Sequence, residues 1–204
     1  MARRGRLHVN PYTFNGLAGR KEPLVVPQGR PLEVELGCGD GLFIVERAAL
    51  KSDVFCLGID IRESFLSPGR ARIDELALDN VVLETANLIV DLGDLFRAGR
   101  VQRFFINFPD PFFKRRHHHR RWLTEDAVNQ LVCALEQDGE LIYQSDVWEL
   151  ALEALTLFSM HSALHNTCGY FSFCQGRVAE PRTSHEKVWE KFKRKIWRMS
   201  FVRH

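Results

Sequence analysis

The chain has 204 residues, 45% of them hydrophobic and 26% charged, which is typical of one globular domain with a substantial core. Lys and Arg number 28 against 26 Asp and Glu, so the net charge of +2 neither indicates nor excludes a nucleic-acid partner. No stretch is long and apolar enough to span a bilayer, and the basic start lacks the apolar core of a secretory signal. These features argue against the membrane and secreted classes and predict a cytoplasmic protein.

The predicted elements alternate between strands and helices along the chain. Strands are expected within 31–36, 53–60, 80–87, 101–108 and 140–146, and helices within 42–50, 70–79, 124–139 and 148–158. Pro68 and Gly69 predict a late start for the second helix, while Thr124 is the expected N-cap of the third and Gly139 lies near its end. Residues 195–201 are predicted to form a terminal strand.

Such alternation predicts an α/β fold, doubly wound, with a mainly parallel sheet and helices on both faces. We expect a basic N-terminal tail over residues 1–30 and a single domain over residues 31–204. Ligands of such sheets bind at the carboxyl ends of the strands, so motifs at those ends are the candidates for function.

The five cysteines stand at positions 38, 56, 133, 168 and 174 and include no Cys-x-x-Cys pair. An odd count without framework spacing is typical of a reducing compartment. We therefore expect neither a metal site nor a disulfide scaffold.

A glycine turn follows the first predicted strand in "VELGCGDG". Its G-x-G-x-G spacing is shorter than the dinucleotide fingerprint, which argues against a dehydrogenase. An acid precedes the first glycine, a second acid ends the second strand, where it can accept hydrogen bonds from ribose hydroxyls, and an Asn ends the third. This combination resembles the S-adenosylmethionine site of class I methyltransferases. The residues are Glu35, Gly37, Gly39, Gly41, Asp60 and Asn87.

An acid between two prolines ends the fourth strand in "INFPDPFF". Pro109 and Pro111 restrict the backbone on both sides of Asp110, which suits a carboxylate that must be positioned. A prolyl loop with a solvated acid is the alternative interpretation.

A basic arm, "KRRHHHRR", follows directly. Lys and Arg at this position favour contacts with an RNA backbone, which we assign to Arg115, Arg116, Arg120 and Arg121. The three histidines form a poor metal site among so many cations. A second basic stretch, "KVWEKFKRKIWRMSF", carries aromatic rings that either stack on RNA bases or pack into the core.

Several segments together resemble the tRNA (guanine-N7)-methyltransferase family. They are "FINFPDPFFKRRHHHRRWLT", "QSDVWE" and "RTSHE", in the family's order. Phe112 stands where the family has Trp, His185 where it often has Tyr or Phe, and Ser145 where it has Thr, and the glycines usual after Glu186 are missing.

The resemblance implies a seven-stranded, Rossmann-like methyltransferase that modifies a guanosine in the tRNA variable loop, at position 46, with S-adenosyl-L-methionine as cofactor. It implies that Asp110 is catalytic and lies beside the cofactor, and that the substrate is bound by Lys114, Asp146, Thr183 and Glu186. Alternatives are a methyltransferase acting on adenine N6 or another RNA base, and a catalytically silent RNA-binding subunit. We expect tRNA as partner, no membrane and no metal, and a monomer or a homodimer.

Overall fold

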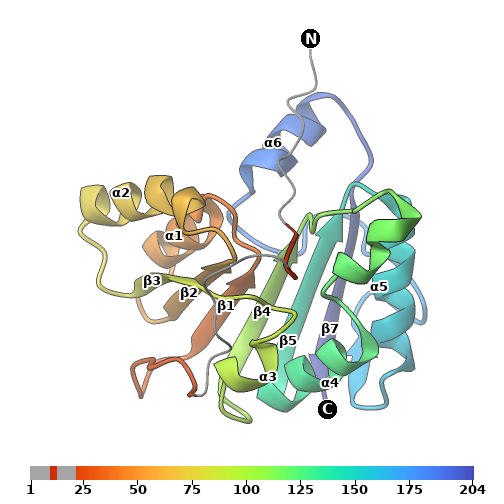
Figure 1. The fold of residues 1–204 in the computed structure, drawn as a ribbon, viewed down its shortest axis with the longest axis horizontal. Helices are drawn as coiled ribbons and strands as arrows, with labels where there is room; N and C mark the ends of the chain where they lie inside the picture. The colour runs from red at the N-terminus through yellow and green to blue at the C-terminus, as the bar shows by residue number, and fades with distance from the viewer. Residues whose placement is uncertain (1–9, 13–21) are drawn as a thin grey trace.

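A seven-stranded sheet forms the centre of the computed structural model, which describes residues 10–12 and 22–204 (Figure 1). The strand order is β3-β2-β1-β4-β5-β7-β6. Strands β1 to β5 pair in parallel, and β7 is antiparallel to both β5 and β6. This confirms the mainly parallel sheet. The strands are β1 (Leu32–Leu36), β2 (Phe55–Asp60), β3 (Val81–Thr85), β4 (Val101–Asn107), β5 (Leu135–Ser145), β6 (Leu164–Asn166) and β7 (Trp197–Arg203).

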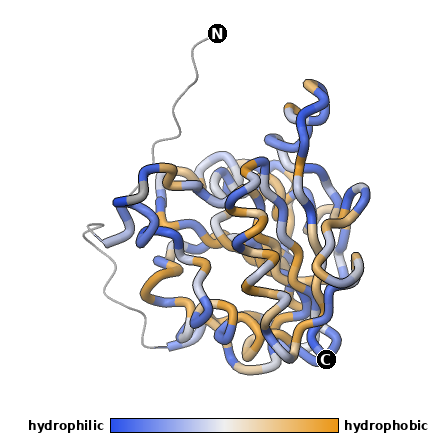
Figure 2. The backbone as a smooth tube through the Cα atoms, turned by 90° about the vertical axis from the view of Figure 1, so that its right-hand side faces the viewer, coloured by the Kyte–Doolittle hydropathy of each residue, from blue (hydrophilic) through white to orange (hydrophobic). Residues whose placement is uncertain are grey.

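Helices cover both faces of the sheet, as predicted (Figure 1). Helix α1 packs in one hydrophobic cluster, and α3, α4 and α5 pack in the other. Figure 2 shows hydrophobic segments gathered toward the interior of the molecule, with many hydrophilic segments in the outer loops. The helices are α1 (Leu42–Leu50), α2 (Ser67–Leu76), α3 (Leu92–Leu95), α4 (Glu125–Ala134), α5 (Trp148–Met160) and α6 (Ser184–Lys191), with short 3₁₀ helices η1 (Glu63–Phe65) and η2 (Arg115–Arg120).

Strand β1 shows how the sequence divides the two faces. Its apolar residues alternate with Glu33 and Glu35, and Leu32, Val34 and Leu36 all enter the cluster that contains α4 and α5. Because side chains alternate across a strand, both glutamates point to the opposite face, toward α1. Both are buried.

Two predicted helix boundaries were wrong. Helix α2 begins at Ser67 rather than after Gly69, because Pro68 lies in the first turn, where its missing N–H has no partner to lose. Helix α4 has Thr124 as its N-cap but ends at Ala134, and β5 follows at once from Leu135. The short elements α3 and β6 and the helix α6 were not predicted.

The terminal strand is confirmed, and most rings of the second basic stretch pack against other side chains. Phe201 is fully buried, Trp197 lies 4.5 Å from the Trp148 ring, and Trp189 stacks on His185 at 4.1 Å. Phe192 is 63% exposed. Packing against other protein side chains therefore explains most of these rings better than stacking on RNA bases does.

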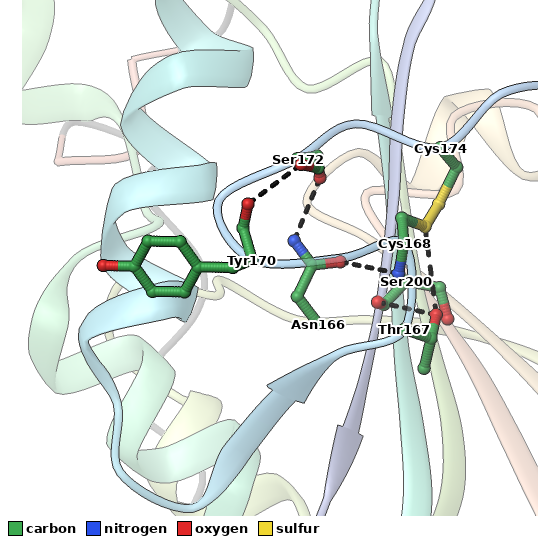
Figure 3. The surroundings of a disulfide bond; sticks show 7 residues. All are labelled: Asn166, Thr167, Cys168, Tyr170, Ser172, Cys174 and Ser200. Atoms are coloured by element: carbon green, nitrogen blue, oxygen red, sulfur yellow. Dashed lines mark hydrogen bonds between the residues drawn. A yellow bond between two sulfur atoms is a disulfide. The ribbon is translucent and has the colours of Figure 1, made fainter.

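A disulfide bond between Cys168 and Cys174 closes the loop after β6, contrary to our expectation for the cysteines. Figure 3 shows Asn166 inside this loop, donating to Ser172 O at 2.9 Å and accepting from Cys168 N at 2.9 Å. The loop conformation brings the two sulfurs together, and spacing in the sequence does not reveal such a pair. Cys38, Cys56 and Cys133 are free.

Most of the predicted basic tail, including Arg3–Arg6, lies outside the described residues. Within the described residues, no helix is long and apolar enough to cross a membrane.

Candidate active site

A cavity of about 810 Å³ lies at the carboxyl ends of the parallel strands. Its volume is in the usual range of small-molecule sites. Nine predicted site residues line it: Glu35, Gly37, Gly39, Asp60, Asn87, Asp110, Arg120, Arg121 and Thr183. Five others do not border it: Gly41, Lys114, Arg116, Asp146 and Glu186. The side chain of Arg115 lies outside the described part of the chain.

The glycine turn after β1 presents bare backbone to this cavity. Gly37 and Gly39 have positive φ angles of 75° and 59°, and a Cβ at either position would meet nothing within 4 Å. A ligand can therefore approach their backbone closely. Gly41 has another role, because its Cβ would lie 2.7 Å from Leu83 Cδ1. It lets the turn pack against β3.

Asp60 connects the end of β2 to this turn. Its carboxylate accepts hydrogen bonds from the backbone N–H groups of Gly39 and Arg62, both at 2.9 Å. Burial raises the pKa of Asp60, and the nearby Asp110 carboxylate adds to the rise, while the two backbone donors oppose it. The charge of Asp110 therefore reaches Asp60, and both residues line the cavity.

Glu35 is a buried acid on the wall of the cavity. It is 3% exposed, and its Oε1 accepts a hydrogen bond from Asn107 Nδ2 at 2.8 Å. Burial raises the pKa of Glu35 to about 8, and the charges of Asp40 and Asp60 add to the rise. Its Oε2 is buried without a hydrogen-bond partner among the described residues.

Asn87 lies two residues beyond the end of β3 and not on the strand as expected, and its side chain already has partners. Its Nδ2 donates to Pro11 O at 2.9 Å, and its Oδ1 accepts from Ile89 N at 3.2 Å. Pro11 also lines the cavity. The short N-terminal segment 10–12 therefore lies beside the position where an adenine edge was expected.

The turn that carries Asp110 is flanked by two residues with positive φ, Phe108 at 50° and Phe112 at 42°. Such values are unusual for bulky side chains and occur where the surroundings hold the backbone. Arg121 Nε donates to Pro111 O at 3.0 Å, and its Nη1 bonds to Glu153 of α5 at 2.8 Å. The turn is thus fixed to a helix by an ion pair.

The basic arm folds into η2, beside the Asp110 turn. Lys114 and Arg116 are exposed, whereas Arg120 and Arg121 border the cavity. Partial desolvation and the neighbouring cations lower the pKa of His117. His117 therefore adds little positive charge to the arm at neutral pH.

Helix α6 supplies the far wall. Thr183 is its N-cap and forms a capping box with Glu186, accepting from Glu186 N at 3.0 Å. Glu186 is 2% exposed and forms an ion pair with Arg198 at 2.6 Å. Asp146 pairs with His185 Nε2 at 3.1 Å, and the His185 ring lines the cavity. Of these residues, Thr183 and His185 face the cavity directly.

The residues present fit S-adenosylmethionine. The open glycine backbone leaves room for a ligand, Asp60 and Asn87 provide polar groups for a nucleoside, and the unpartnered Glu35 oxygen suits a cation. The described residues contain no cluster of His, Cys, Asp or Glu arranged to hold a metal ion.

Sequence reasoning missed the polar residues that hold these acids. Asn107 ends β4, Gln144 is the next-to-last residue of β5, and Arg198 lies opposite Gln144 on β7. Polar residues at buried strand ends were the available signal for the first two. The pattern Thr-x-x-Glu in "RTSHE" was a signal for the capping box of α6.

The chain also resembles proteins of known family. A family model described as "Putative methyltransferase" matches residues 29–199. A tRNA (guanine-N(7)-)-methyltransferase of Synechococcus sp. (strain JA-3-3Ab) is 36% identical over 174 residues, covering 81% of this chain and 72% of the relative. The protein of the same name from Thermosynechococcus vestitus is 34% identical over 176 residues, covering 82% and 81%.

Solved structures support the fold. The 16S rRNA methyltransferase KamB superposes with a TM-score of 0.60 at 11% identity, covering 86% of this chain and 89% of that one. Precorrin-6y C5,15-methyltransferase of Geobacter metallireducens has a TM-score of 0.57 at 15% identity, covering 87% and 82%. These likenesses show the class I methyltransferase architecture. Together with the glycine turn, the cavity and the sequence relatives, they place this chain in the tRNA (guanine-N7)-methyltransferase family.

Proposed function

We propose that this protein transfers the methyl group of S-adenosylmethionine to N7 of a guanosine in tRNA. One observation carries the proposal: Asp110 lines the same cavity as the open glycine turn and Asp60. A stiffened carboxylate therefore borders the space in which a nucleoside cofactor fits. Family membership supplies the base and the atom.

S-adenosylmethionine, when bound, supplies a methyl group activated by a positively charged sulfur. Guanine N7 has an in-plane lone pair exposed in the major groove. It forms a bond to the methyl carbon as the carbon–sulfur bond breaks, so no proton has to be removed. The protein must mainly align the reacting atoms, and such alignment can supply about 7–11 kcal/mol.

The methylated purine carries the positive charge that leaves the sulfur. We assign Asp110 to stabilising this charge as it develops, and not to removing a proton. Its turn is held by Arg121 and Glu153, so the carboxylate needs little reorganisation during the reaction.

Selecting guanine requires acceptors for its N1–H and N2–H₂ groups. We assign this to the pair of Asp146 and His185, in which the His185 ring borders the cavity and Asp146 holds that ring through its Nε2. Thr183 borders the same wall. Glu186 faces Arg198 in the interior, so its part in substrate binding is to position α6. Lys114, Arg116 and Arg120 are assigned to the RNA backbone.

The test is incubation with isotopically labelled S-adenosylmethionine and unmodified tRNA, followed by chemical cleavage at 7-methylguanosine. We expect a single modified position in the variable loop. Digestion to nucleosides separates the alternatives, because N6-methyladenosine would indicate the adenine enzyme. Cofactor binding without transfer to any RNA would indicate the silent subunit. We propose action in the cytoplasm, as a monomer or a homodimer.

A further inference from the structure

A chain of polar side chains crosses the carboxyl edge of the sheet at the wall of the cavity, with Glu35, Gln144 and Glu186 buried and Asn107 and Arg198 partly buried. Asn107 Nδ2 donates to Glu35 Oε1 at 2.8 Å, and Gln144 Nε2 donates to Asn107 Oδ1 at 2.9 Å. The same Gln144 Nε2 lies 3.5 Å from Glu186 Oε2. Arg198 Nη2 donates to Glu186 Oε1 at 2.6 Å. The chain thus joins β1, β4, β5, α6 and β7.

The orientation of each amide in this chain follows from its neighbours. Glu186 accepts hydrogen bonds from Arg198 Nη2 and from the backbone N–H of Thr183, so the group of Gln144 that faces it must be a donor. Gln144 must therefore present its NH₂ group, and Asn107 must turn its carbonyl oxygen toward that group. The NH₂ group of Asn107 then faces Glu35.

We propose that Asn107 and Gln144 are positioning residues. The Arg198–Glu186 ion pair fixes the orientation of their two amides, so that Asn107 donates to Glu35 Oε1 and the other oxygen of Glu35 stays available to a cationic cofactor. This inference rests on the proposed function, because it assumes that the cavity binds S-adenosylmethionine. It adds two residues to the site and links the packing of α6 to cofactor binding.

The surroundings of Glu35 give this orientation its effect. The charged groups that act on Glu35 are Asp40 and Asp60. The charge of Glu35 in turn contributes to the raised pKa of the Cys38 and Cys56 thiols. The two acids and burial favour the neutral carboxyl group, with a pKa of about 8, while the Asn107 amide and the backbone of Ile44 oppose them. Removing or reversing the Asn107 donor would therefore leave Glu35 neutral to higher pH, and a neutral carboxyl attracts a cation less.

Gln144→Glu reverses the polarity of the chain and is the main test. Once ionised, a carboxylate at this position only accepts hydrogen bonds, so Asn107 must turn its NH₂ group toward it and its carbonyl oxygen toward Glu35. Gln144→Met is the matched control, because it keeps the length of the side chain without imposing an orientation on Asn107. Asn107→Leu removes the donor itself and serves where Gln144→Glu does not fold.

The measurement is calorimetry of S-adenosylmethionine binding, without RNA, from pH 6 to 9 in two buffers of different ionisation enthalpy. For the wild type we expect release of about one proton at neutral pH and an affinity that rises about tenfold per pH unit until it levels off near pH 8. In Gln144→Glu and Asn107→Leu the levelling should move upward by about one pH unit, and in Gln144→Met by less.

A second measurement needs no ligand. The folded-state pKa of Glu35 lies above its ordinary value, so Glu35 stabilises the ligand-free protein at low pH and this contribution is lost as pH rises toward about 8. In Gln144→Glu this loss of stability should extend to higher pH. Urea denaturation at several pH values measures it. Unchanged pH profiles and proton release in folded Gln144→Glu and Asn107→Leu would overturn the inference. The expected pH profiles in the wild type and the variants, together with no methylation of tRNA by the wild type, would instead contradict the proposed function.

Discussion

Glu33 and Glu35 show how two identical side chains on one strand acquire different roles. Both point away from the α4–α5 face and both are buried. Glu33 meets Arg47 at 2.6 Å and Arg103 at 2.7 Å. The Oε2 of Glu35 is buried without a hydrogen-bond partner among the described residues, and Glu35 is one of the residues that line the cavity. A buried acid whose charge is not compensated is a functional candidate, and a paired one is structural.

Asp110→Asn should lower turnover by about 10²–10³-fold, because the amide keeps the shape but loses the charge that stabilises the methylated purine. Affinity for S-adenosylhomocysteine should change much less. The measurement is single-turnover methylation of tRNA alongside calorimetry. Asp126→Asn, at an exposed acid of α4, should behave as the wild type. A near-normal single-turnover rate for Asp110→Asn would remove this residue from the chemistry.

At the scale of elements, the site depends on loops that are tied to helices. The Asp110 turn is tied to α5 through Arg121 and Glu153, and α6 begins with the capping box of Thr183 and Glu186. Sequence patterns had grouped Arg121 with the phosphate-binding arm and Glu186 with the substrate-binding residues. Their partners are far away in sequence, so only the folded structure shows that both hold elements in place.

Thr183→Val should remove the N-cap of α6 and lower local stability by about 1 kcal/mol. Thr183→Ser keeps the accepting hydroxyl oxygen and is the control. Hydrogen exchange of the first turn of α6 should become faster in the valine variant alone. Equal exchange rates in both variants would mean that the capping box contributes nothing to holding this wall of the cavity.

Glu33→Gln should destabilise the fold by about 3–5 kcal/mol, because it leaves the buried Arg47 guanidinium without its charged partner. The loss affects the contacts that join β1 to α1 and β4. Urea denaturation measures it. Glu46→Gln breaks a more exposed pair with Arg72 and should cost only about 0–1 kcal/mol. A similar decrease in the free energy of unfolding for both variants would contradict the role of Glu33–Arg47 as a stabilising buried ion pair.

At the scale of the whole molecule, the order of strands and helices was predictable and the side-chain network was not. Alternating apolar runs and glycine turns fix the βαβ order, and the carboxyl-edge rule brings Glu35, Asp60, Asn87 and Asp110 to one cavity. The junction of α4 and β5 was missed because no Gly or Pro separates them. The tie between Asn107 and Gln144 depends on strand register, which local patterns do not encode.

The distribution of charge over the molecule makes a last prediction, on how salt weakens tRNA binding. Each exposed cation that neutralises a phosphate releases counterions, so Lys114→Ala and Arg116→Ala should each reduce the slope of log affinity against log salt by about one. Arg121 is different, because its side chain is only 12% exposed and is paired with Glu153. Arg121→Ala should therefore leave the slope unchanged and lower turnover instead, since the Asp110 turn loses its support. Filter binding of tRNA between low and physiological salt measures the slopes. A reduced slope for Arg121→Ala with normal turnover would return Arg121 to the RNA-binding arm.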